Sequence, residues 1–208
     1  MSSLPELLPY RGAATERLLL REFSHRVKDE LASAISLVAA AAGRCDSGEA
    51  RAVLVAVLDR LQSHALVHRS LQMPEYDTTV DVAAYLQQLC RAISRAELAG
   101  AGIELSLSVH PLRINADRCW LLGMIVFELI ADAARHTFPN GTRSIRLEIW
   151  PAGSLIECCI SDDGIADDGS LQSDGLAILE ALVGNLQGAV EDRSGPSGSR
   201  RVVKVPIH

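Results

Sequence analysis

The sequence predicts an α+β protein in which an N-terminal antiparallel helical hairpin precedes a layered α/β sandwich. Two long segments repeat apolar residues every three or four positions and are joined by a short polar turn, which is typical of a helical hairpin. The second half combines shorter helical segments with segments of alternating polarity, which indicates helices packed on a mostly antiparallel sheet. Of the 208 residues, 48% are hydrophobic, so the chain can bury a core.

The hairpin is expected at residues 12–75, after a tail at residues 1–11. Its first helix is predicted from about residue 12 to residue 43, because one apolar stripe runs through this segment. The stripe consists of Leu20, Phe23, Val27, Leu31, Ile35 and Val38.

A short polar turn leads into the second predicted helix, which runs from Glu49 to Leu71. Ser47 is the expected N-cap and Asp46 the alternative, because both side chains can accept a hydrogen bond from a backbone N–H. Each helix carries one apolar stripe, and a lone hairpin cannot bury both. We therefore expect a homodimer in which two hairpins form a four-helix bundle.

Residues 76–208 are predicted to form the sandwich. Helical periodicity alternates there with short segments that read as strands, and Pro151-Ala152-Gly153 indicates a hairpin turn. A Gly/Ser/Pro loop is expected at residues 194–199. The predicted elements are, in order, a helix at 81–98, a strand at 103–109, a helix at 115–136, strands at 143–150 and 154–160, a helix at 175–186, and strands at 189–192 and 201–206.

Composition excludes several classes of protein. The net charge of −6 argues against nucleic acid as the main partner, since such proteins usually carry a basic excess. No apolar run approaches the roughly 18 residues of a membrane span, and the N-terminus does not resemble a secretory signal. The five cysteines are scattered without a C-x-x-C pair, so we expect buried thiols in a reducing cytoplasm rather than zinc ligands or disulfides.

His25 is the first candidate catalytic residue. It lies two positions from apolar stripe residues on both sides, so its side chain points away from the stripe. Glu22, Lys28 and Asp29 are three or four positions away, within side-chain reach. Neutral imidazole is a competent nucleophile near pH 7, and a carboxylate on one ring nitrogen leaves the other free. Position alone favours an ordinary solvated histidine, so the assignment depends on the neighbouring sequence.

The string SHRVKDEL around His25 resembles the phosphoacceptor box of two-component sensor histidine kinases, in the subgroup whose box reads His-Arg-Val-Lys-Asn. ALVHRSL, at residues 65–71, matches the end of that subgroup's second helix, and VDVAAYLQQLC, at residues 80–90, resembles its connection into the ATPase domain. The resemblance extends from about residue 16 to the end. It implies a hairpin for dimerisation and histidine phosphotransfer, a histidine-kinase/Hsp90-type ATPase-like α/β sandwich, and a response-regulator receiver domain as partner.

FELIADAARHTF, at residues 127–138, resembles the N box of the same family. Glu128, Arg135 and His136 match the family pattern, whereas Asp132 replaces the magnesium-binding Asn. Hard cations take carboxylate oxygens, so the resemblance leaves Asp132 as a magnesium ligand if ATP binds. It also adds a negative charge beside a triphosphate.

SDDG, at residues 161–164, resembles the first glycine box, in which Asp162 would take the adenine amino group and Gly164 is the first glycine. The second glycine box begins at Gly175. Alanine replaces the next glycine of each box, at positions 166 and 177, and could crowd a nucleotide. The segment between the boxes has no Lys or Arg and contains acidic residues, which repel a triphosphate. These residues are Asp167, Asp168 and Asp174.

The resemblance implies two candidate functions. In the first, the chain is a phosphorelay protein, in which His25 exchanges phosphate with an aspartate of a receiver domain and no cofactor is needed. In the second, it is an active soluble histidine kinase that phosphorylates His25 from ATP and magnesium. A phosphatase or a scaffold for a regulator would need only the hairpin. The altered nucleotide motifs and the expected lack of a sensor domain favour the phosphorelay, and Leu19 and Leu20 are expected to help dock the receiver.

Overall fold

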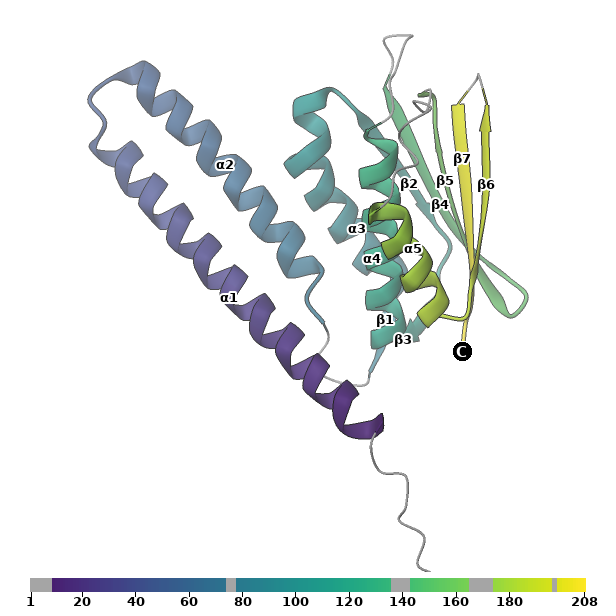
Figure 1. Ribbon diagram of the computed structural model, residues 1–208. Coiled ribbons are helices and arrows are strands. Elements are labelled where there is room, and N and C mark those ends of the chain that lie inside the picture. The colour runs from purple at the N-terminus through teal and green to yellow at the C-terminus, as the bar shows by residue number, and fades with distance from the viewer. Residues whose placement is uncertain (1–8, 74–77, 136–142, 165–173, 196–197) are drawn as a thin grey trace, which may run out of the picture. The chain divides into compact units, whose positions relative to one another are not determined.

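The structure is a computed structural model in which the chain divides into two units, residues 1–73 and 74–208 (Figure 1). It describes residues 9–73, 78–135, 143–164, 174–195 and 198–208. None of the described helices is long and apolar enough to cross a membrane.

The first unit is an antiparallel hairpin of α1, Pro9–Arg44, and α2, Gly48–Ser70 (Figure 1). The predicted N-cap is confirmed, because the Ser47 side chain accepts a hydrogen bond from the Ala50 N–H at 3.3 Å. The expected tail is wrong for residues 9–11, which already belong to α1. A proline is compatible with the first turn of a helix because the N–H it lacks has no partner there.

The hairpin leaves much apolar surface exposed. Its only buried apolar residues in the described part are Ala42 and Val67. The middle and C-terminal part of the predicted stripe is half-buried, whereas Phe23 in its N-terminal part is 65% exposed. The other exposed large apolar residues of the two helices are Leu18, Leu19, Leu20, Leu37, Val53, Val55, Val57 and Leu66. Two helices alone therefore do not bury their apolar positions.

The second unit contains a five-stranded sheet with the strand order β2-β4-β5-β7-β6. The β2–β4 pair is parallel and the remaining neighbours in this sheet are antiparallel. A separate antiparallel pair joins β1, Thr79–Asp81, to β3, Arg113–Asn115. The strands of the large sheet are β2, Glu104–Val109; β4, Ser144–Ala152; β5, Leu155–Asp162; β6, Ala189–Gly195; and β7, Gly198–Pro206.

Three α-helices cover one face of this sheet: α3, Val82–Ile93; α4, Ala116–Ala133; and α5, Asp174–Asn185 (Figure 1). The core lies between the two layers, where inward positions of α3, α4 and the central strands are fully buried. These positions include Leu86, Leu89, Leu122, Ile125, Leu129, Leu147, Ile149 and Ile156. The predicted α+β architecture of a helical hairpin followed by an α/β sandwich is confirmed.

Two segments differ from the prediction. The helix expected to continue to residue 98 changes at Ser94–Leu98 into the π-helical segment η1, which the 3₁₀ turn η2, Ala99–Ala101, follows. The loop expected at residues 194–199 is largely strand, because β6 and β7 extend into it. Gly198 makes this possible: its φ is +131°, and a Cβ there would overlap the carbonyl oxygen of Asp162. Positions 196–197 lie outside the described residues.

Candidate functional site

His25 lies on α1 with its side chain exposed to solvent. Glu22, one of the residues predicted within reach of His25, forms an ion pair with Arg26, with 2.9 Å between Glu22 Oε1 and Arg26 Nε. The guanidinium of Arg26, at i+4, therefore competes with His25 for this carboxylate. Asp29 and Lys28 remain within reach by helical spacing, and both are exposed.

Glu128 and Asp132 of the N box lie on α4, Arg135 lies in the turn after it, and Asp132 meets a side chain from the far end of the sequence. Asp132 accepts hydrogen bonds on both carboxylate oxygens: Oδ1 lies 2.9 Å from Arg135 Nη2, and Oδ2 lies 2.7 Å from Arg201 Nη1. Arg201, on β7, also binds Asp192 of β6 through Nη2 at 2.6 Å and Nε at 3.0 Å. One arginine from the sheet thus joins two carboxylates, one of them at the position of the family's magnesium ligand.

Arg201 is a buried cation, with 10% of its side chain exposed. Burial alone would lower the pKa of this guanidinium, but its hydrogen bonds with Asp192 and Asp132 raise the pKa above its ordinary value. Arg201 therefore stays charged, and its charge is balanced by the two carboxylates. Sequence reasoning missed it, although one signal was present: Arg201 occupies an inward position of β7, between the buried residues Ser199 and Val203.

This arrangement does not fit a magnesium site at Asp132. Magnesium binds by direct contact with carboxylate oxygens, and both oxygens of Asp132 are already engaged by guanidinium groups. A divalent cation at Asp132 would lie beside the guanidinium groups of Arg135 and Arg201, and their positive charges would repel it. The assignment of Asp132 as a magnesium ligand is therefore not supported by the structure.

The residues that resemble the glycine boxes lie near the same helix. Asp162 ends β5 in a buried position, and its Oδ1 accepts a hydrogen bond from the Gly164 N–H at 3.0 Å. Gly175, in the first turn of α5, faces α4: a Cβ at this position would lie 3.3 Å from Arg135 Nη2 and 3.7 Å from Glu128 Oε2. The structure therefore brings Glu128, Asp132, Arg135 and Gly175 together.

Several predicted features of the nucleotide site lie outside the described residues. They are His136, Ala166, Asp167 and Asp168. Ala177 is described and lies exposed on α5. Of the described residues, no group of three or more His, Cys, Asp or Glu side chains could hold a metal ion.

Glu128 provides a pH-dependent test of this site. Burial raises the pKa of its carboxyl; Arg135 opposes that shift, and Asp132 and Glu97 add to it. A carboxyl with a raised pKa favours the folded state when protonated, and this contribution is lost as the pH rises through its folded-state pKa. We expect Glu128→Gln to raise the melting temperature at pH 8 and to leave it unchanged at pH 4. A stabilisation that grows on acidification would contradict this assignment.

Comparison with known proteins agrees with the phosphoacceptor box and the fold. Residues 22–97 match the family described as histidine kinase. The sensor histidine kinase PdtaS of Mycolicibacterium smegmatis is 29% identical over 210 residues, which cover 95% of this chain and 41% of that protein. Blue-light-activated histidine kinase 2 of Erythrobacter litoralis is 23% identical over 96% of this chain and 60% of that protein.

Solved structures of histidine kinases share the fold of this chain. The histidine kinase domain of the Erythrobacter litoralis EL346 blue-light-activated histidine kinase superposes with a TM-score of 0.58 at 17% identity, over 86% of this chain and 96% of that domain. This chain spans about two fifths of the length of PdtaS, so the likeness concerns the hairpin and sandwich alone. Residues 22–97 are thus similar to the histidine kinase family, and the hairpin and sandwich share the fold of a histidine kinase domain.

Proposed function

We propose that the chain is a histidine phosphotransfer protein, in which His25 accepts phosphate from an aspartate of one receiver domain and donates it to another. The pairing of Asp132 with Arg135 and Arg201 carries this proposal, because it occupies the carboxylate that magnesium would need. The exposed imidazole of His25, within the family match, supports the transfer itself.

The proposed transfer needs only one nucleophile from this chain. The lone pair of a neutral His25 ring nitrogen attacks the phosphorus of the phosphoaspartate, a P–N bond forms, and the P–O bond to the aspartate breaks with the carboxylate as leaving group. Reversal of these bond changes on a second receiver returns the neutral imidazole. Asp29 is proposed to accept the N–H of the other ring nitrogen, and Lys28 to attract phosphoryl oxygens.

The hairpin supplies the surfaces that this reaction requires. Leu19 and Leu20, about a turn and a half before His25, are 62% and 52% exposed, and they are proposed to contact the receiver domain. The apolar residues left exposed along α1 and α2 support a homodimer that buries them in a four-helix bundle.

An active histidine kinase is the second candidate. Two observations favour it: Glu128, Arg135 and Gly175 lie together near α4, and the relatives with matching sequences are named histidine kinases. ATP and magnesium would then be the cofactors, and Asp162 and Gly164 would contact the nucleotide. Asp132 would then hold the metal ion close to the guanidinium group of Arg201.

The two candidates differ in their response to Asp162→Asn. Receiver domains from the same genome, labelled on aspartate with radioactive acetyl phosphate, are mixed with the full chain, and the label on the chain is followed. A phosphotransfer protein takes label from a receiver at an unchanged rate in the Asp162→Asn variant and takes none from ATP. Labelling from ATP in the wild type that disappears in Asp162→Asn would instead establish the kinase.

A further inference from the structure

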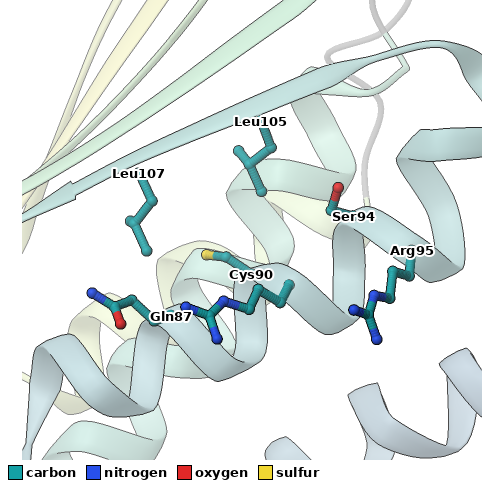
Figure 2. Close-up of a pocket in the computed structure, with 7 residues that line it drawn as sticks. Gln87, Cys90, Ser94, Arg95, Leu105 and Leu107 are labelled. Carbon is teal, nitrogen blue, oxygen red and sulfur yellow. The ribbon is translucent and has the colours of Figure 1, made fainter.

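The sandwich contains a groove of about 380 Å³ between α3, η1 and the strand β2 (Figure 2). It lies beside β2, at the opposite edge of the sheet from β6. None of the described residues discussed for nucleotide binding lines this groove.

The floor of the groove is apolar. Cys90 of α3 is 4% exposed, and burial raises the pKa of its thiol to about 12, so it stays protonated and uncharged. Leu105 and Leu107 are half-buried, alternate with the exposed Ser106 along β2, and point toward the helix that carries Cys90 (Figure 2). These three side chains form a surface on which an apolar group can be desolvated.

The rim of the groove is polar and positively charged. Arg91 and Arg95 lie four residues apart on consecutive helical segments, and both are exposed. Within the described part of the chain neither forms an ion pair, and no Asp or Glu lines the groove. Like charges at this spacing repel each other, so an anion bound between the two guanidinium groups would reduce this repulsion. Gln87 and Ser94 add hydrogen-bonding groups to the same rim.

The backbone beside the groove is irregular. In η1 the Ala99 N–H donates to the Ser94 carbonyl oxygen five residues earlier, which is the hydrogen bond of a π-helix. This wide turn carries Ser94 and Arg95, two of the rim residues. π-helical turns are rare and frequently occur at functional sites, which agrees with a ligand site here.

We propose that this groove binds a small organic carboxylate with an apolar tail. The carboxylate lies between Arg91 and Arg95 and accepts hydrogen bonds from both guanidinium groups. The tail covers Cys90, Leu105 and Leu107. The volume of the groove falls in the range of small-molecule sites, and its apolar floor with a few polar groups at the rim is their usual composition.

Decanoate is a suitable probe, and its binding can be followed in the full chain by the methyl NMR signals of labelled leucines. We expect decanoate below its micellar concentration to shift the Leu105 and Leu107 signals. The double variant Arg91→Gln/Arg95→Gln should weaken this binding by at least about tenfold, because two charge-assisted contacts are lost. Arg146→Gln, which removes an exposed arginine from β4 outside the groove, is the matched control and should not change it.

Decyltrimethylammonium carries the same tail with a positive head, and it should leave the Leu105 and Leu107 signals unchanged. Three outcomes would overturn the proposal: no shift at these leucines, equal affinity in the double arginine variant, or shifts confined to exposed leucines of the hairpin such as Leu18 and Leu19. The last outcome would mean that decanoate binds only to the exposed apolar surface of α1.

Discussion

Replacing His25 with Gln is expected to reduce phosphate uptake from a labelled receiver domain to background. Glutamine keeps a polar side chain of similar length on the exposed face of α1, but its amide nitrogen is not a nucleophile, so no P–N bond can form. The measurement is the acid-labile, base-stable radioactive phosphate on the chain after mixing with the receiver, because phosphohistidine has this stability pattern.

His68→Gln is the matched control for this variant. His68 is also an exposed histidine of the hairpin, on α2, and it has no role in the proposed phosphotransfer reaction. Uptake should therefore be unchanged in His68→Gln. If His25→Gln still carries acid-labile phosphate, the assignment of His25 as the phosphoacceptor is wrong.

Replacing Arg201 with Ala is expected to lower the free energy of unfolding by about 3 kcal/mol. Arg201 neutralises Asp132 and Asp192, whose side chains are only 22% and 35% exposed. Removing the guanidinium leaves two partly buried carboxylates without their shared partner, and this cost is larger than that of an exposed ion pair. Urea unfolding of the full chain, followed by circular dichroism, measures the loss.

Lys204→Ala is the control on the same strand. Lys204 Nζ lies 2.6 Å from Glu191 Oε1, but both side chains are substantially exposed, so the loss should be much smaller than that in Arg201→Ala. Equal losses in the two variants would show that the Arg201 cluster is an ordinary surface ion pair. The claim that the buried guanidinium of Arg201 neutralises the carboxylate of Asp132 would then be wrong.

Local patterns in the sequence predicted most of the fold. The hairpin follows from apolar spacing and from Ser47, whose cap depends only on a neighbour three residues away. The strands β1 and β3 were missed because three residues are too few to establish an alternating pattern. The change to a π-helix at Ser94 was also missed, because the apolar periodicity continues across it.

The candidate site was predictable where it depends on neighbours along the chain, and less so elsewhere. Helical geometry predicted the outward direction of His25, but it could not choose between His25 and Arg26 as the partner of Glu22. The contact of Asp132 with Arg201 joins residues 69 positions apart, so it depends on how α4 packs against the sheet that contains β7. The only local indication that Arg201 is buried was its place at an inward-facing position of the alternating pattern of β7.

The most direct test of the central claim is isothermal titration calorimetry of ATP with magnesium into the full chain. Arg135 and Arg201 bind the carboxylate of Asp132, and we propose that the sandwich does not bind magnesium-ATP. We therefore expect no detectable heat of binding at millimolar ATP. Micromolar binding that is lost in the Asp162→Asn variant would contradict it and would make the chain an active histidine kinase.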